Sequence, residues 1–231
     1  MSAVNPSLPI AANANMSIAS LNESAVWDIL RGDLHAASST LRAALCLLRN
    51  QDSSERYICR PITSVELNEN TLSPIFFFSR PFVLVEVTQD DLTEENSTTP
   101  VVAILYNLAL IHHTIGESSQ DPALRRHSFK HAMGLYYHAH LAMSNAENVW
   151  SFSHKQNLLL FLAVCNNIAA INFERHEYGE VNRYMDFIIS LTFFDDITEN
   201  LDDEEYDFFF TASLVLRETF RDSLFSMAAA A

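Results

Sequence analysis

Residues 165–188 read CNNIAAINFERHEYGEVNRYMDFI, and this stretch decides the fold. An apolar segment ends in the turn-like tetrapeptide Arg175-His176-Glu177-Tyr178. Apolar residues then recur at Val181, Met185 and Ile188. Steps of four and three residues place these side chains on one face of an α-helix. The segment before the turn is helical in pattern as well, so we expect two antiparallel helices joined by a tight turn.

The same pattern occurs twice more along the chain. Residues 21–45 contain a first apolar segment, the turn Arg31-Gly32-Asp33-Leu34, and then Ala37, Leu41 and Ala44. Residues 106–139 contain Tyr106-Asn107-Leu108-Ala109, with Gly116 expected to end the first helix, and then Ala132, Tyr136 and Ala139. The longer turn of this copy closes with Asp121-Pro122, a capping residue followed by a residue suited to the first helical position.

The three copies predict an all-α fold: a repeat-type stack of antiparallel helical hairpins with a small β-hairpin insertion and a C-terminal capping helix. The alternative is an irregular helical bundle in which the small residues only allow close packing. The expected segments are a disordered N-terminus (1–16), hairpin 1 (17–50), an inserted loop and β-hairpin (51–98), hairpin 2 (99–146), hairpin 3 (151–194), and an acidic linker with the capping helix (195–231).

The insertion and the C-terminal region depart from the hairpin pattern. Tyr57 to Val65 and Phe82 to Val87 are rich in β-branched and aromatic residues, which favours two short strands. Phe76-Phe77-Phe78 is either covered by neighbouring helices or an exposed partner patch, and burial is favoured because exposed apolar runs promote aggregation. Acidic residues 195–207 precede a helix expected over 201–227, where they suit the helix dipole or dock a basic partner.

These features resemble the tetratricopeptide repeat, over roughly half of the chain. The matching residues are Gly32-Asp33-Leu34 with Ala37 and Ala44, Asn107-Leu108-Ala109 with Ala132, Tyr136 and Ala139, and Asn167-Ile168-Ala169 with Tyr178 and Ile188. The chain departs from the family in lacking its proline after each second helix and in having Val181 where alanine is preferred. The wording of these segments is also similar to a group of diatom proteins of this type.

The resemblance implies a non-catalytic scaffold or adaptor that binds a protein or peptide along a concave groove lined by the first helices. Asparagine side chains there can hydrogen-bond the backbone of an extended peptide. Asn22 is one such asparagine. The expected contact residues are Tyr106, Asn107, Leu110 and His113 from the second copy, and Asn166, Asn167, Ala170 and Phe173 from the third. On this hypothesis, Asn107→Ala with Asn167→Ala weakens partner capture without unfolding the chain.

Charge restricts the partner. The chain has 29 acidic and 14 basic side chains and a net charge of −15, which disfavours nucleic acid and anionic membrane surfaces. The family's clamp for acidic peptide termini needs Lys or Arg beside the asparagines, and these first helices carry none there. A neutral or basic protein or peptide is therefore the expected partner, and the sequence does not predict an oligomeric state.

A metal-binding protein or metal-dependent enzyme is the alternative, because six of nine histidines lie between His112 and His140. His127, His131 and His138 share roughly one side of a helix, and His112 or His113 on the preceding helix could approach them. Imidazoles in such a set bind Zn²⁺, Ni²⁺ or Cu²⁺, but no HExxH motif or carboxylate completes the site.

The remaining motifs indicate no enzyme, cofactor or membrane anchor. The sequence lacks a G-x-S-x-G elbow and a phosphate-binding loop, and His176-Glu177 has no second histidine to complete a metalloprotease motif. The apolar run from Leu158 to Cys165 is too short to cross a bilayer, and residues 1–20 lack the basic start of a signal peptide. Cys46 and Cys165 lie in apolar stretches and are expected to be buried thiols, so we expect an intracellular protein, cytoplasmic or nuclear.

Overall fold

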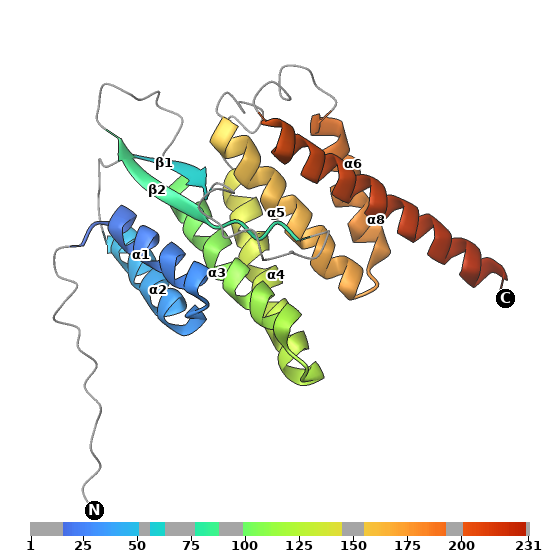
Figure 1. Cartoon of the computed structure of the whole chain (residues 1–231), viewed down its shortest axis with the longest axis horizontal. Helices are drawn as coiled ribbons and strands as arrows, with labels where there is room; N and C mark the ends of the chain where they lie inside the picture. Colours follow the sequence, from blue (N-terminus) through green and yellow to red (C-terminus); the bar gives the residue numbers. More distant parts are fainter. Residues whose placement is uncertain are drawn as a thin grey trace, which may run out of the picture.

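The computed structural model describes residues 16–50, 56–62, 77–87, 99–144, 155–192 and 201–229. This part of the chain is mostly helical and contains one small two-stranded antiparallel sheet, which confirms the predicted class (Figure 1). In chain order the elements are α1 (Ile18–Arg31), α2 (Leu34–Asn50), β1 (Arg56–Pro61), β2 (Phe82–Val87), α3 (Thr99–Ser118), α4 (Pro122–Ser144), α5 (Lys155–Glu174), α6 (Tyr178–Thr192) and α8 (Asp203–Ala229).

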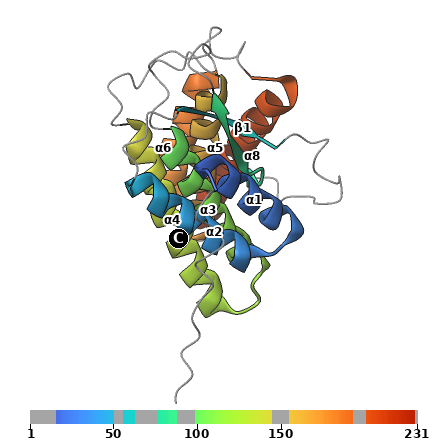
Figure 2. The ribbon, with the colours of Figure 1, turned by 90° about the vertical axis from the view of Figure 1, so that its left-hand side faces the viewer.

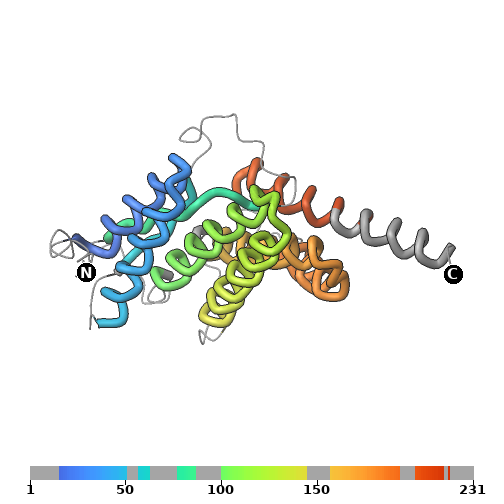
Figure 3. The backbone as a smooth tube through the Cα atoms, turned by 90° about the horizontal axis from the view of Figure 1, so that it is seen from below, coloured from blue at the N-terminus to red at the C-terminus, as the bar shows by residue number. Residues whose placement is uncertain are grey.

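Each helix packs on the next one along the chain. The closest pairs are α1 with α2, α3 with α4, and α5 with α6, while α2 also contacts α3, α4 contacts α5 and α6 contacts α8. Seen from below, the pairs follow one another from α1 and α2 at one end to α8 at the other (Figure 3). One hydrophobic core runs through all of them, from Ile18 in α1 to Phe209 in α8.

Two of the predicted tight turns adopt the same helix-ending geometry. Gly32 after α1 has φ 81°, and its turn closes with bonds from Gly32 N to Ile29 O and from Asp33 N to Asp28 O. His176 after α5 has φ 60°, with bonds from His176 N to Phe173 O and from Glu177 N to Asn172 O. This left-handed cap satisfies the last helical carbonyls, and glycine adopts it without strain.

The acidic start of the last helix serves as a cap. The Glu205 N–H donates to Asp202 Oδ1 at 2.9 Å, and the Asp202 N–H donates to Glu205 Oε2 at 3.1 Å. These reciprocal bonds form a capping box, and the carboxylates of Asp203 and Glu204 in the first turn suit the helix dipole. The helix begins at Asp203, two residues later than predicted, and residues 193–200 lie outside the described part of the chain.

Gly116 does not end its helix, contrary to the prediction. α3 continues to Ser118, and Gly116 is a point of close approach instead. A Cβ atom at this position would lie 2.6 Å from the Phe129 ring of α4. The glycine therefore lets the α3 and α4 backbones approach with the Phe129 ring between them.

We expect Gly116→Ala to lower the free energy of unfolding by about 1–2 kcal/mol, because overpacking exceeds the gain of about 1 kcal/mol in helix propensity. Gly134→Ala in α4 is the matched control. Nothing lies within 4 Å of its added Cβ, so it should raise the free energy of unfolding by up to about 1 kcal/mol. Urea unfolding of both variants measures the difference. Equal shifts in the free energy of unfolding would show that the Phe129 ring moves aside without a loss of stability.

The two predicted strands pair as an antiparallel sheet. Cys59 lies opposite Leu84, and Pro61 lies opposite Phe82. The sheet packs on helices from different pairs, since β2 contacts α1 and α3 while β1 contacts α3 and α5 (Figures 1 and 2). The preference for burial of the aromatic run is confirmed for Phe77 and Phe78, and Phe76 lies outside the described residues.

The core helix and the cysteines change two further expectations. α5 is the one described helix that is long and apolar enough to cross a membrane, over Asn157–Glu174, but 83% of that window is buried inside the protein. Its burial is that of a core helix. Cys165 is buried as predicted, whereas Cys46 is exposed because it lies on the side of α2 away from Leu41 and Ala44.

Candidate functional site

The most unusual feature of the structure is a buried row of asparagines that contacts one extended segment of the same chain. We call residues 77–84 the strap. Asn22 of α1, Asn107 of α3 and Asn167 of α5 have no exposed surface. Their Oδ1 atoms accept hydrogen bonds from the strap N–H groups of Leu84 (2.8 Å), Phe82 (2.9 Å) and Phe78 (2.9 Å), respectively. The strap thus crosses three helices that are far apart in sequence (Figure 1).

Two of these asparagines pair with the strap as a neighbouring β-strand would. Asn107 Nδ2 donates to the Phe82 carbonyl at 2.7 Å, so its amide binds both main-chain groups of Phe82. Asn167 does the same at Phe78, with its Nδ2 3.0 Å from the carbonyl oxygen. A carboxamide carries the donor and acceptor of a peptide group, so it can replace one rung of a sheet. These contacts recognise the main chain of the strap and do not depend on the identity of its side chains.

The sheet register explains why the asparagines can bind the edge of β2 that faces away from β1. Phe82 and Leu84 lie opposite Pro61 and Cys59, and their N–H groups point away from β1 toward the asparagines. Main-chain groups alternate direction along a strand, so the residues between them face β1. β2 is therefore bound on one edge by β1 and on the other by side-chain amides.

Asn22 makes a weaker contact than the other two. Its Nδ2 atom is buried and has no hydrogen-bond partner within the described residues.

Asn167 is the centre of a larger buried network. Its Nδ2 also lies 3.0 Å from the Tyr136 hydroxyl and 3.3 Å from that of Tyr106, and Asn166 Nδ2 donates to its Oδ1 at 3.3 Å. The Tyr106 hydroxyl in turn donates to the Phe78 carbonyl at 2.7 Å. Burial raises the pKa of both tyrosines, so both hydroxyls stay protonated and can donate.

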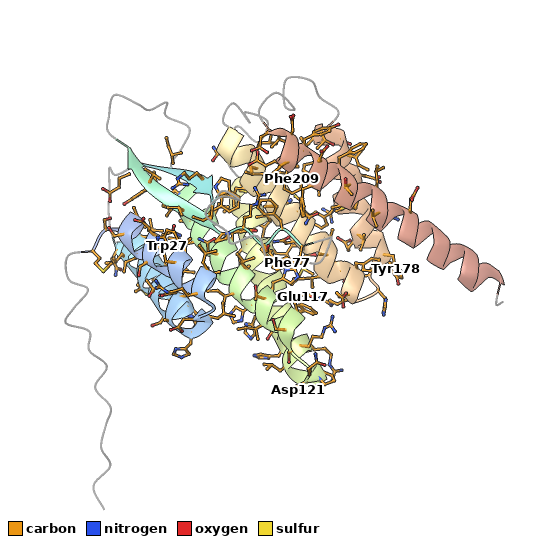
Figure 4. The ribbon with its side chains drawn as sticks, viewed as in Figure 1. Trp27, Phe77, Glu117, Asp121, Tyr178 and Phe209 are labelled. Carbon is orange, nitrogen blue, oxygen red and sulfur yellow. The ribbon has the colours of Figure 1, made fainter. Side chains whose placement is uncertain are left out.

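His113 extends the network toward the surface. Its Nδ1 lies 3.5 Å from the Tyr136 hydroxyl, its ring lies 3.9 Å from that of Phe77, and its Nε2 lies 3.8 Å from the Glu117 carboxylate. Burial lowers the pKa of His113 to about 3, so the imidazole is neutral. Burial and then the nearby Glu174 carboxylate raise the pKa of Glu117. Figure 4 labels Phe77 and Glu117, the two residues whose contacts with His113 are given above.

The strap side chains fill apolar positions on the helices. The Phe78 ring stacks on Phe209 of α8 at 5.3 Å and meets the edge of Phe208 at 5.4 Å. The Phe82 ring meets Tyr106 edge-on at 5.0 Å. Between them, Arg80 forms an ion pair with Glu204 at the start of α8 at 2.9 Å. The strap is therefore held by main-chain pairing, the aromatic contacts of Phe78 and Phe82, and one charge pair.

Four of the expected contact residues, Tyr106, Asn107, His113 and Asn167, come together against the strap, but the set does not line an open groove. The strap covers the face that the sequence assigned to a foreign peptide. Seven of the expected contact residues are buried and Phe173 is half-buried: Tyr106, Asn107, Leu110, His113, Asn166, Asn167, Ala170 and Phe173. We also expect, in contrast to the sequence prediction, that removing Asn107 and Asn167 together unfolds the chain, since both bind the chain's own backbone. Sequence reasoning missed Tyr136 as a network member and the strap as the occupant.

One buried side chain near this network has no role in it. Asn172 of α5 has no exposed surface, and neither of its amide atoms has a hydrogen-bond partner among the described residues. An unsatisfied buried amide costs about 1–3 kcal/mol. We expect Asn172→Leu, which has the same branching and the same number of side-chain heavy atoms, to raise the free energy of unfolding by about 1–2 kcal/mol. Thermal and urea unfolding would measure this, and a destabilised variant would show that the amide has a partner such as buried water.

The histidine cluster offers little support for a metal site. The His131 ring lies 4.4 Å from that of His127 and 5.3 Å from that of His112, and His127, His131 and His138 are all exposed. Within the described ranges, no group of three or more His, Cys, Asp or Glu side chains is placed to hold a metal ion. Burial, followed by the His131 charge, lowers the pKa of His112.

Together these observations define the chain as a mainly helical protein whose helices hold an extended segment through buried amides. Comparisons with protein-family models, with curated proteins and with solved structures found no match to it. The interpretation of the site therefore depends on its own geometry.

Proposed function

We propose that this protein is a non-catalytic scaffold of tetratricopeptide-like helical hairpins that binds an extended protein or peptide segment. The observation that carries the proposal is the two-point amide pairing of Asn107 with Phe82 and of Asn167 with Phe78. This pairing is a means of holding extended polypeptide, because main-chain bonds supply affinity and flanking pockets supply specificity. The order of the helix pairs supports the repeat-type stack, with α8 covering the last pair.

The strap must be replaced, and not merely released, when a partner binds. It buries Phe77, Phe78, Phe82, Val83 and Leu84, each worth about 1.5–3 kcal/mol when fully buried. Their sum is comparable with the whole stability of a typical domain, about 5–15 kcal/mol. A partner that enters this groove therefore has to supply similar apolar side chains.

The charge and the cysteines add to the proposal. A net charge of −15 favours a neutral or basic partner and disfavours nucleic acid. Cys59 and Cys165 are buried free thiols, and burial raises the pKa of both, which suits the reducing interior of a cell, cytoplasmic or nuclear. The exposed histidines do not favour the metal-dependent alternative, so we do not propose it.

The proposal is tested by converting the strap into a free peptide. Specific protease sites are placed within residues 63–76 and 88–98, the purified full chain is cleaved at both, and a fluorescent peptide of residues 77–87 is added. We expect the labelled peptide to exchange into the groove, as measured by anisotropy, with circular dichroism unchanged. Retention of fold with no exchange or binding of any strap peptide would contradict the proposed function.

An asparagine variant makes this test specific. In the cleaved protein, Asn107→Ala should lower the affinity for the labelled peptide by about 30-fold or more, since two main-chain groups of the peptide lose their partners. Asn22→Ala removes a single hydrogen bond and should lower the affinity for the labelled peptide by about fivefold. Equal affinities for all three proteins would show that the amides do not hold the peptide.

A further inference from the structure

We propose that the strap is an internal counterpart of the partner segment, and that the groove selects an extended polypeptide with aromatic residues at the first and fifth of five positions and a basic residue at the third. The pattern corresponds to Phe78, Ser79, Arg80, Pro81 and Phe82. This inference rests on the proposed function, and it adds the chemistry of the partner and a reason for the groove to be closed at rest.

The two aromatic positions are specified by the helices around them. Phe78 lies between Phe208 and Phe209 of α8, and Phe82 lies against Tyr106 of α3. These rings sit at the two residues whose main chains are paired by Asn167 and Asn107. The spacing of four residues is therefore set by the distance between α3 and α5. A side chain smaller than an aromatic ring would leave a cavity at either place.

The basic position is specified by charge. Arg80 lies midway between the two aromatic residues, and its guanidinium meets Glu204 at 2.9 Å. Glu204 stands in the acidic first turn of α8, beside Asp203. Ser79 is exposed, so the position between the first ring and the base has no side-chain requirement. The complementarity between this turn and a base agrees with the strongly acidic composition of the chain.

A covalently attached strap competes strongly with any free segment. A linked segment has an effective concentration of millimolar order. A free peptide of equal intrinsic affinity therefore half-occupies the uncleaved protein only near a millimolar concentration, whatever its affinity for the cleaved one. The strap thus excludes chance aromatic peptides and admits a partner that is tethered nearby or makes contacts beyond the groove.

The test compares peptides on the full chain, both uncleaved and cleaved on either side of the strap. The parent peptide is residues 77–87, FFSRPFVLVEV. Changing either Phe78 or Phe82 of the peptide to alanine should weaken binding to cleaved protein by at least about 100-fold. Changing Ser79 to alanine, the matched control, should have no effect. The uncleaved protein should bind the parent peptide only near millimolar concentration.

Charge exchange tests the basic position separately. Arg80→Glu in the peptide should weaken binding to cleaved protein by roughly fivefold, the range of a partly exposed ion pair. Glu204→Lys in the protein should reverse the preference, so that the Glu-containing peptide binds better. Binding that ignores both aromatic positions and the charge exchange would overturn this inference. It would leave the proposed function standing, because a peptide would still be bound.

A second copy of the chain is the other possible source of such a segment. Light scattering of the uncleaved protein distinguishes it, because exchange of straps between copies produces a dimer. A monomer across the concentration range supports a separate partner. A dimer that dissociates when the parent peptide is added would overturn the proposal of a foreign partner in favour of strap exchange between copies.

Discussion

We expect Asn107→Ala and Asn167→Ala each to lower the free energy of unfolding by about 3–4 kcal/mol. Asn107→Ala leaves the buried N–H and carbonyl of Phe82 without their side-chain partner. Asn167→Ala does the same to the Phe78 N–H and removes donors from two tyrosine hydroxyls. An unsatisfied buried main-chain group costs about 1–3 kcal/mol. Urea unfolding followed by circular dichroism measures the loss.

Asn22→Ala is the control for this series. The substitution leaves the main-chain N–H of Leu84 without its acceptor, which lowers stability. It also removes the Asn22 amide nitrogen, which is buried without a hydrogen-bond partner in the described structure, and this removal raises stability. The two effects partly offset, so we expect a loss of only about 1 kcal/mol. If all three variants lost the same stability, the number of strap bonds would not decide the cost.

The double variant separates the two interpretations of these residues. The sequence interpretation predicts that Asn107→Ala with Asn167→Ala stays folded and loses its partner. The structure instead predicts a loss of about 6–8 kcal/mol, which few domains of about 5–15 kcal/mol tolerate without partial unfolding at 25 °C. A double variant of native stability would mean that the strap is held by its side chains alone.

The local features of this fold could be predicted because they depend on neighbours in sequence. The left-handed cap at Gly32 and the restart at Asp121-Pro122, where Asp121 Oδ1 accepts from the Ala123 N–H at 2.9 Å, follow from residues a few positions apart. The strand at Phe82–Val87 follows from its β-branched composition. Each of these signals lies within one turn or one strand.

The path of the strap could not be predicted in the same way. The bond between Phe78 and Asn167 joins residues 89 positions apart, and it depends on how three helix pairs are placed. No local propensity encodes that placement. The sequence predicts that the asparagines bind extended backbone, but the identity of what they bind depends on this long-range packing. Gly116 was misread for a similar reason, since its neighbour Phe129 belongs to the next helix.

The second large effect concerns pH and His113. Its folded pKa of about 3 lies below the ordinary value of 6.5, so the unfolded chain binds a proton more readily than the folded one. This contribution to stability is fully present above pH 6.5 and is lost as pH falls toward 3. One proton is worth up to about 1.4 kcal/mol per pH unit, which gives about 2 kcal/mol at pH 5.

Most of the loss should be traceable to His113, which has the larger shift in pKa. Protonated His113 would have to reach the Glu117 carboxylate, 3.8 Å from Nε2, while its other nitrogen faces the Tyr136 hydroxyl, 3.5 Å away, beside the Phe77 ring. His113→Gln keeps a polar side chain without the titration, so its stability should be lower at pH 7 and should fall less between pH 7 and 5 than that of the wild type. The slope that stays comes from His112 and His140, because burial also lowers the pKa of these two histidines. His127→Gln, at an exposed site, should keep the full pH dependence. A wild type equally stable at pH 7 and pH 5 would show that His113 can be protonated in the folded chain, and that the strap can move from it.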